Sequence, residues 1–535
     1  MMAGFATVLI VAMEPFGLGG RTMADFSRAM SRRGALKVAG AGAGALAMRQ
    51  FTLPQQALAQ EAAPGVLRWA TDDEWAGKEV LDPASPDRLW ESLGALYNRL
   101  VKPDNDGLPV PDLALEWSPD AGAERWTFTL RPDVTFHDGR RFTAKDVVAT
   151  VAHVLDPDLQ SPSAAVLEII DVDGFETPDD QTVIFSLKQP HADFPMLMLH
   201  YSMYIIPEGS SAEEIGTLGI GTGPFRLESF NPGSTTRLVA NENYWEGVPG
   251  LKGIELIPIA DVEARISALM AGQVDFIDGF SGSSVAVLEA NPNVMLQELP
   301  SGNWTTLVMR CDQAPFDNAD VRQAMKLVVD RPFAVQAVLQ GHGVPANDHP
   351  VWPGDPYALA EERPQDLEAA RELLAGAGFP DGLTVELFTS DIQGPMASLA
   401  VVYKEMAAAA GINVDVKQTP ADGYWNDIWM NKPFCTSSWG ERPADQVLNE
   451  VFRAGATWNE SFWEDAEFEQ LLDDARREID ADVRRGLYQE AQQRLMNGSG
   501  NIIPFFTTDL RALSSRVQNF ADTQRDLNYF TVSVE

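Results

Sequence analysis

The chain has 535 residues, of which 45% are hydrophobic and 22% charged, and its formal net charge at pH 7 is −37. A chain of this length can bury a large core without disulfides or metals, and we expect two or three domains, since one domain usually holds roughly 100–200 residues. The acidic balance excludes binding to nucleic acid or anionic lipid, which need patches of Lys and Arg, and indicates either a solvated surface or a field that attracts cationic ligands.

The first 59 residues have the order of parts expected of an export signal. Arg32 and Arg33 precede a stretch of small and apolar residues at 38–48, and an A-x-A-like cleavage site follows at 57–59. This order is typical of a removable signal peptide, and the paired arginines are typical of twin-arginine export. The apolar stretch holds about 11 residues, whereas ~20 are needed to span a bilayer, so a membrane anchor is disfavoured. We predict a twin-arginine signal peptide at 1–59 and a periplasmic mature protein.

Short strands are the main elements predicted in the first half of the mature chain. The clearest is 125–130, where apolar and polar residues alternate as in a half-buried strand. Thr143 followed by Asp146 predicts a capping box that opens a helix. Further strands are expected at 66–71, 181–187, 224–230, 235–240, 253–259 and 274–277, with a helix over 262–270.

Strands and helices alternate after residue 303. The predicted strands are 305–310, 383–388, 413–417 and 502–507, and the predicted helices are 321–329, 367–374, 396–410 and most of 464–497. Such alternation is typical of a layer in which helices cover a sheet, so the predicted fold class is α/β.

Several blocks of sequence carry a resemblance to a known family. One of them reads Trp126-Thr-Phe-Thr-Leu-Arg-Pro-Asp-Val-Thr-Phe-His-Asp-Gly139. The others lie at 112–117, 142–148, 221–225, 243–245, 266–275, 321–331 and 377–382. In this order they resemble the family 5 extracellular solute-binding proteins, which are the periplasmic dipeptide-, oligopeptide- and nickel-binding components of ABC importers. The resemblance covers nearly the whole mature chain.

The resemblance implies an α/β, two-lobe periplasmic-binding-protein fold of the large, cluster C type, which has three regions and a cleft at a hinge. The chain would cross between the lobes near residue 302 and again near residue 505, and closure about this hinge would enclose a ligand. The implied division is lobe one at 60–95, 220–302 and 505–535, an inserted region of lobe one at 96–219, and lobe two at 303–504.

The resemblance also points to one loop as a ligand contact. The family pattern places a Trp three residues before an Asp that pairs with the amino terminus of the ligand. The corresponding Trp here is Trp439, but Arg442 stands at the Asp position, with Glu441 beside it. If Arg442 faces the cleft, its forked guanidinium suits a carboxylate or phosphate. If Glu441 faces inward instead, the site recognises an amine; a solvated loop that contacts no ligand is the third alternative.

Further candidates for ligand contact are aromatic or polar residues that follow predicted strands or the first crossing. Aromatic walls with a few polar groups are usual for small-ligand sites, although packing in the core is the alternative for each Trp. These candidates are Asn303, Trp304, Tyr424, Trp458, Asn459 and Asp73.

No sequence motif for catalysis, metal binding or a nucleotide cofactor is present: there is no G-x-S-x-G, no H-E-x-x-H and no P-loop. We therefore predict a non-enzymatic substrate-binding protein of an ABC importer, without cofactor, that captures a peptide or another small organic solute. Its partners would be that solute and the ABC permease in the inner membrane, and it would act as a monomer. The alternative is an exported hydrolase that uses a pair of carboxylates in the cleft.

Overall fold

The computed structural model describes residues 65–535 except 73–76, 105–106, 162 and 521–528. The predicted export signal at 1–59 and the candidate Asp73 lie outside the described residues. No helix in the described ranges combines the length and the apolar character that crossing a bilayer requires.

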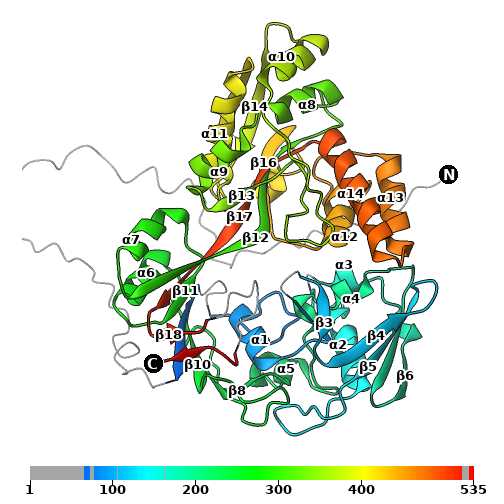
Figure 1. Ribbon diagram of the computed structural model, residues 1–535, viewed down its shortest axis with the longest axis vertical. Coiled ribbons are helices and arrows are strands. Elements are labelled where there is room, and N and C mark those ends of the chain that lie inside the picture. The colour runs from blue at the N-terminus through cyan, green and yellow to red at the C-terminus, as the bar shows by residue number, and fades with distance from the viewer. Residues whose placement is uncertain (1–64, 73–76, 105–106, 162, 521–528) are drawn as a thin grey trace, which may run out of the picture. The chain divides into compact units, whose positions relative to one another are not determined.

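An 11-stranded mixed sheet runs through the described part of the chain (Figure 1). Its order is β15-β14-β16-β12-β17-β11-β1-β10-β9-β8, with β13 paired to β17 off this path. The bounds are β1 Val66–Thr71, β8 Phe225–Ser229, β9 Thr236–Ala240, β10 Gly253–Pro258, β11 Phe276–Asp278, β12 Val294–Met309, β13 Gly343–Pro345, β14 Leu383–Thr389, β15 Ile412–Gln418, β16 Phe434–Trp439 and β17 Asn501–Ser514. Every strand predicted after residue 224 has a counterpart in this sheet.

The long strands β12 and β17 join the two ends of this sheet. At one end β12 pairs with β16, and at the other end β17 pairs with β11. The antiparallel β12–β17 ladder shifts register between Pro300 and Trp304 and again between Thr305 and Leu307. The prediction of a strand at 305–310 was therefore too short, because Pro300 and Gly302 interrupt the apolar pattern without ending the strand. We call the two parts of the sheet the β14 end and the β1 end.

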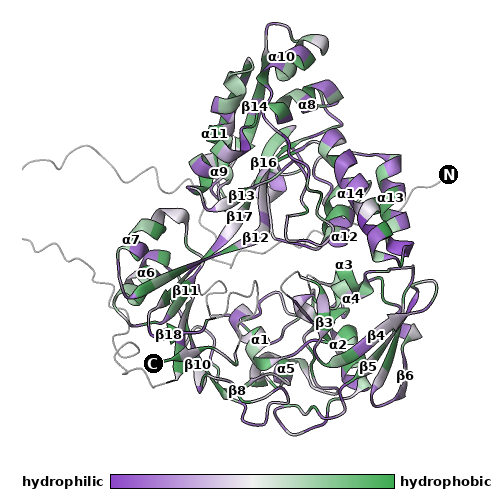
Figure 2. Ribbon diagram, in the orientation of Figure 1, coloured by the Kyte–Doolittle hydropathy of each residue, from purple (hydrophilic) through white to green (hydrophobic). Residues whose placement is uncertain are grey.

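Helices cover the sheet at both ends, and each end has its own apolar cores. At the β14 end the helices are α8 Ala319–Leu327, α9 Arg331–Leu339, α10 Leu367–Gly376, α11 Met396–Ala408, α12 Ala444–Val447, α13 Ala466–Arg477 and α14 Ala481–Gly498. At the β1 end they are α1 Leu93–Leu96, α5 Ala212–Leu218, α6 Val262–Met270 and α7 Val285–Glu289. In Figure 2, α13 and α14 carry many hydrophilic residues.

A second, four-stranded sheet lies within residues 114–186, in the order β4-β5-β7-β6. Its strands are β4 Ala114–Pro119, β5 Arg125–Leu130, β6 Glu176–Asp179 and β7 Thr182–Ser186, and the helices packed near it are α2 Ala144–Val154, α3 Ala164–Leu167 and α4 Phe194–Leu197. Two small hairpin-like pairs complete the strands: β2 Val101–Pro103 with β3 Pro109–Pro111, and β18 Val517–Gln518 with β19 Ser533–Val534. The capping box predicted at α2 is confirmed, since the Thr143 N–H donates to Asp146 at 2.7 Å.

The glycine-rich segment at 221–223 lies directly against the backbone of α1. A Cβ added to Gly221 would come within 2.0 Å of the carbonyl oxygen of Leu96, and one added to Gly223 within 2.5 Å of the carbonyl oxygen of Ala95. His137 fixes the same segment, because its Nε2 lies 3.0 Å from the Gly223 carbonyl oxygen. The turn that contains His137 is therefore structural.

The variant Gly223→Ala tests this close approach. We expect it to lower the free energy of unfolding by about 1–3 kcal/mol, because the added methyl group displaces a packed backbone. The measurement is the midpoint of urea unfolding. Gly376→Ala in α10 is the matched control, since nothing lies within 4 Å of its added Cβ. Equal midpoints for the two variants would contradict the packing described here.

Candidate functional site

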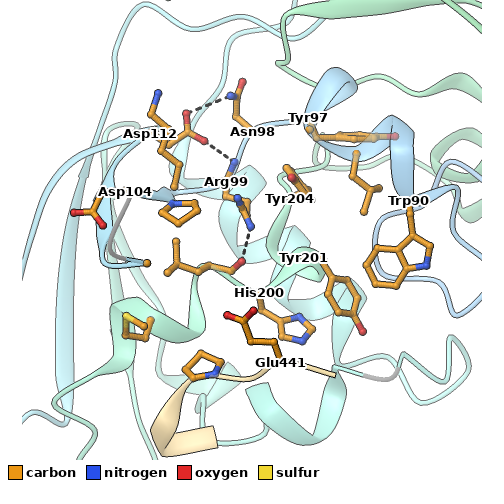
Figure 3. Close-up of a pocket in the computed structure, with 18 of the residues that line it drawn as sticks. Trp90, Tyr97, Asn98, Arg99, Asp104, Asp112, His200, Tyr201, Tyr204 and Glu441 are labelled. Carbon is orange, nitrogen blue, oxygen red and sulfur yellow. Dashed lines mark hydrogen bonds between the residues drawn. The ribbon is translucent and has the colours of Figure 1, made fainter. Parts of the chain in front are cut away.

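A cavity of about 900 Å³ is lined by residues from both ends of the large sheet and from the segment that carries the four-stranded sheet. Ligand pockets for small molecules usually measure about 300–1,000 Å³ and are lined mainly by apolar and aromatic groups. The aromatic lining here is Trp69, Trp90, Tyr97, Tyr201, Tyr204, Tyr244, Phe276, Trp352, Trp458, Phe520, Tyr529 and Phe530. Figure 3 shows one wall of this cavity, where Glu441 lies among residues of the segments 90–112 and 200–204. The size and lining fit a small organic ligand.

One aromatic wall is fixed by a cation. The guanidinium carbon of Arg88 lies 3.6 Å from the ring centroid of Trp90 and 4.0 Å from that of Tyr201. The two rings also contact each other edge to face, with centroids 4.6 Å apart. Cation–π contacts of this kind hold the rings in place before any ligand arrives. This part of the wall is therefore preorganised.

Carboxylates outnumber cations in the cavity lining. The carboxylates are Glu91, Asp104, Asp112, Glu246, Asp278, Asp355, Glu441 and Glu450, and the permanent cations are Arg99, Lys102, Arg442 and Arg511. Burial raises the pKa of Asp112 to about 6 despite the opposing charge of Lys102. Because unlike charges attract, this lining favours ligands that carry a positive group.

Glu441 and Arg442 both line the cavity, but they differ in their partners. The Arg442 guanidinium donates to Glu450 at 3.1 Å and to the Gly440 carbonyl at 3.0 Å, so its charge is balanced within the protein. The Glu441 carboxylate accepts the backbone N–H of Gly302 at 2.8 Å. Because the charge of Arg442 is already balanced within the protein, the geometry disfavours the anion-recognising alternative for this loop.

Asn303 holds this loop against the crossing strands. Its side-chain oxygen accepts the backbone N–H of Glu441 at 2.8 Å, and Gly302 is packed so closely that a Cβ there would lie 2.3 Å from Glu441 Cγ. Asn303 is thus a positioning residue for Glu441 and does not itself line the cavity.

The other candidates predicted from the sequence fall into two groups. Trp458 lines the cavity, with its ring 6.0 Å from that of Trp439. Trp304, Tyr424 and Asn459 are buried and make contacts inside the protein: Trp304 stacks on Trp439 at 5.9 Å, the Tyr424 hydroxyl donates to the Thr436 carbonyl at 2.8 Å, and the Asn459 amide donates to the Trp463 carbonyl at 2.8 Å. For these three residues, core packing explains the burial.

A buried carboxylate orients Trp439. Glu460 accepts the indole N–H of Trp439 at 3.2 Å, that of Trp429 at 2.7 Å and the Asn501 amide at 2.9 Å. Burial raises the pKa of Glu460 to about 7, against the lowering effect of these hydrogen bonds. Glu460 therefore fixes Trp439, on which Trp304 stacks and against which Trp458 packs at a tilt, within the β14 end.

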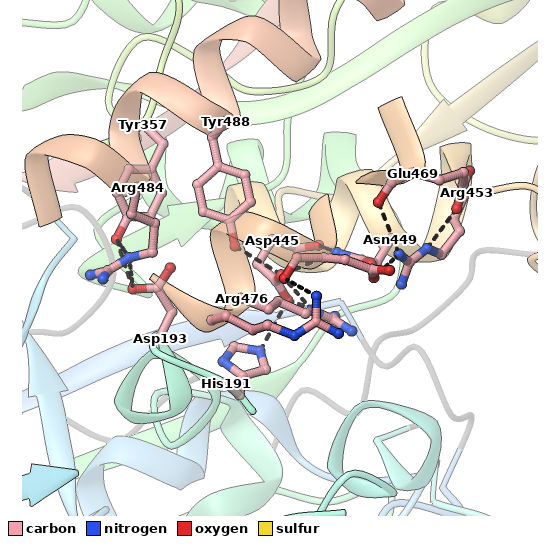
Figure 4. A network of polar contacts seen from close by, with 12 residues as sticks. His191, Asp193, Tyr357, Asp445, Asn449, Arg453, Glu469, Arg476, Arg484 and Tyr488 are labelled. Atoms are coloured by element: carbon pink, nitrogen blue, oxygen red, sulfur yellow. Dashed lines mark hydrogen bonds and ion pairs between the residues drawn. The ribbon is translucent and has the colours of Figure 1, made fainter. Parts of the chain in front are cut away.

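A network of polar contacts joins residues 191–193 to the β14 end (Figure 4). The Asp193 carboxylate accepts the Tyr357 hydroxyl at 2.7 Å and pairs with Arg484 at 2.9 Å. His191 lies 3.1 Å from Asp445, and the Ala192 N–H donates to the carbonyl of Arg476 at 2.7 Å. These contacts are buried, so they hold the two walls of the cavity against each other.

Asp445 is the centre of this network. Both of its oxygens accept hydrogen bonds from Arg476, each at 2.8 Å, and the Tyr488 hydroxyl donates to it at 2.9 Å. Burial alone would raise the pKa of Asp445, but the charge of Arg476 and the contact with His191 hold that pKa well below its usual range. The carboxylate is therefore charged over the whole neutral range, which keeps the network intact.

The sequence did not reveal the residues that the β1 end contributes to the cavity. These residues include Trp69, Asp278 and Arg511. Trp69 lies in β1, which the sequence predicts only as a buried strand, and Asp278 and Arg511 lie beyond the predicted ends of β11 and β17. The one signal available was the charge of Asp278, which directly follows the strand predicted at 274–277.

The comparisons with known proteins decide the family. A family profile described as bacterial extracellular solute-binding proteins, family 5 (Middle), matches residues 109–456. The chain belongs to this family. Glutathione-binding protein GsiB of Pectobacterium atrosepticum is 27% identical over 453 residues, which are 79% of this chain and 87% of that protein. Heme-binding protein A of Haemophilus influenzae is 26% identical over 477 residues, 82% of this chain and 87% of that protein.

Solved structures bear out the fold. HbpA2 from Haemophilus parasuis superposes with a TM-score of 0.77 at 24% identity, covering 88% of this chain and 99% of that one. The unliganded open form of the murein tripeptide-binding protein MppA gives a TM-score of 0.76 at 20% identity, covering 88% and 98%. The predicted α/β, two-lobe periplasmic-binding-protein fold is confirmed, and the protein is a solute-binding protein of the ABC-importer type.

The network around Asp193 predicts how closure responds to mutation. In Asp193→Ala the buried Arg484 loses its counter-charge, and removing one partner of a buried pair costs about 3–5 kcal/mol, so the two walls should separate to let water reach Arg484. Small-angle X-ray scattering of the ligand-free protein should then give a larger radius of gyration than the wild type.

Asp465→Ala is the matched control, because its pair with Arg494 joins α13 to α14 within the β14 end. We expect that variant to keep the radius of gyration of the wild type. An unchanged radius in Asp193→Ala would show that these contacts do not hold the walls together.

Proposed function

We propose that this protein is the periplasmic substrate-binding component of an ABC importer, that it captures a peptide-like or other small organic solute in the cavity, and that it delivers the solute to the permease in the inner membrane. The observation that carries the proposal is the aromatic cavity of about 900 Å³, which is lined from both ends of a sheet that β12 and β17 join. A ligand there touches both walls at once, and closure draws its free energy from contacts that exist only in the closed state.

The same proposal includes the division of the chain and its route of export. Lobe one comprises 60–95, 220–302 and 505–535, with an inserted region at 96–219, and lobe two comprises 303–504. The register shifts of β12 and β17 near residues 300–306 support a hinge at these boundaries. Residues 1–59 act as a twin-arginine signal peptide, and the mature protein works as a monomer by binding alone, without turnover.

The acidic lining supports a ligand that carries an amine. Eight carboxylates and four permanent cations line the cavity, and the charge of one of these cations, Arg442, is balanced by Glu450. The relatives differ in their solutes: one is a glutathione-binding protein, another is a heme-binding protein, and the structural neighbour DppA from Helicobacter pylori holds the peptide STSA. Among these, a peptide-like solute with a free amino group matches the charges of this cavity best.

A thermal-shift screen tests the ligand class. The probes are short peptides with free and with acetylated amino termini, amino-acid derivatives, opines and sugars. A ligand present at 100 times its Kd stabilises the folded protein by ~2.7 kcal/mol, which raises Tm measurably. We expect free-amine compounds to raise Tm, acetylated ones to fail, and Glu441→Gln to lose the effect.

Arg442→Gln is the neighbouring control and should keep at least part of the shift. Loss of the shift in Arg442→Gln alone, or equal binding of acetylated compounds, would overturn amine recognition by Glu441. Recovery of a probe in cleaved form would instead revive the hydrolase alternative.

A further inference from the structure

Three polar groups lie together on the part of the cavity formed by the β1 end. In the antiparallel pair of β11 and β17, Asp278 stands directly opposite Arg511. In the parallel pair of β1 and β11, Trp69 stands beside Phe276, two residues before Asp278. Directly paired residues and residues two apart share one face of a sheet, so these side chains project from the same face. Trp69, Asp278 and Arg511 all line the cavity, and we call them the floor triad.

The floor triad has unused hydrogen-bonding capacity. Within the described residues, the side chains of Arg511 and Asp278 make no hydrogen bond and no ion pair, although the two residues oppose each other across the ladder. The indole N–H of Trp69 is buried and also has no partner there. A half-buried charge without a partner is costly, so such groups usually meet a ligand, an ion or water.

The other permanent cations of the cavity lining have partners within the protein. Arg442 pairs with Glu450 and Lys102 pairs with Glu246, while Arg99 donates to the carbonyl of Leu199. Arg511 therefore differs from every other permanent cation in the lining. The charge of Arg511 acts on Asp278. Burial raises the pKa of Asp278 to about 6, against the lowering effect of the charges of Arg511 and Arg265.

The pairing of opposite charges limits what can bind there. A simple anion drawn to Arg511 would be repelled by Asp278, and a simple cation drawn to Asp278 would be repelled by Arg511. Side chains directly opposite on a ladder have Cβ atoms about 5 Å apart, so one small group with both charges can reach both. A carboxylate next to an ammonium, as in an α-amino acid, has this arrangement.

We propose that the floor triad is a subsite for an amphoteric head group, in which Arg511 and the Trp69 N–H bind the carboxylate and Asp278 binds the ammonium. This inference rests on the proposed function and names the part of the ligand that lobe one recognises. Arg511 offers two parallel donors to the carboxylate, a geometry that Lys lacks. Glu441 lines the cavity from the β14 end and is not part of the floor triad.

Calorimetric titration with simple probes tests the subsite. The probes are L-lysine and L-tyrosine, each compared with its Nα-acetyl derivative and its carboxamide. We expect the free amino acids to bind the wild type at least about tenfold more tightly than either derivative, since each derivative removes one charge-assisted contact. Arg511→Gln and Asp278→Asn should each weaken the free amino acids by about the same factor. Arg511→Gln should leave the carboxamides unaffected, because they lack the carboxylate, and Asp278→Asn should leave the Nα-acetyl derivatives unaffected, because they lack the ammonium.

Arg237→Gln is the matched control, because Arg237 lies in β9 outside the cavity lining and pairs with Glu255. It should bind as the wild type does. If Arg511→Gln does not fold, Arg511→Lys replaces it; this variant keeps the charge but loses the fork, and an intermediate affinity is expected.

The outcomes separate this inference from the proposed function. If a peptide or other solute binds the wild type and binding is lost in Trp458→Ala but not in Arg511→Gln or Asp278→Asn, the cavity is a solute site and the floor triad is not its head-group subsite. If amino acids and their derivatives bind equally, the inference is overturned as well. If no compound of the solute screen binds the wild type at all, the proposed function itself fails.

Discussion

The antiparallel pairing of β12 with β17 is the constraint on which the rest of the structure depends. These two strands, Val294–Met309 and Asn501–Ser514, join the two ends of the large sheet, because β12 also pairs with β16 and β17 also pairs with β11. Their ladder is irregular only near residues 300–307. Two strands that bend at one place resist separation of the lobes but allow rotation, which is what a hinge requires.

The loop that carries Glu441 is attached to β12 where the register of the ladder shifts. Gly302 and Asn303 lie within the first register shift, between Pro300 and Trp304, and through two hydrogen bonds they hold Glu441 at the edge of the cavity. A bend of β12 therefore moves a cavity residue directly. Farther from the hinge, the contacts of Asp193 and Asp445 close the opposite side, so the cavity is bounded by the hinge at one edge and by a buried polar network at the other.

Much of this architecture could be predicted from the sequence, because local chemistry determines it. The capping box of Thr143 and Asp146 and most strands followed from short-range patterns, and collinear blocks indicated the family. The cavity lining could be predicted only in part. The charge of Arg442 is balanced by Glu450, eight residues along the chain. The side chain of Arg511 lies opposite Asp278 of β11 without forming an ion pair among the described residues. Neither relation can be predicted from the local sequence. Trp304 and Tyr424 resembled cavity residues because aromatic side chains serve cores and cavities equally well.

The central claim is that the cavity holds one small solute between two lobes and releases it unchanged. Native mass spectrometry of the protein with the solute identified by thermal shift tests this claim most directly. The account predicts one solute per chain, weakened binding when Trp458 and Arg511 are replaced, and recovery of the intact solute after denaturation. Recovery of a cleaved or altered solute, or undiminished binding in those variants, would contradict it.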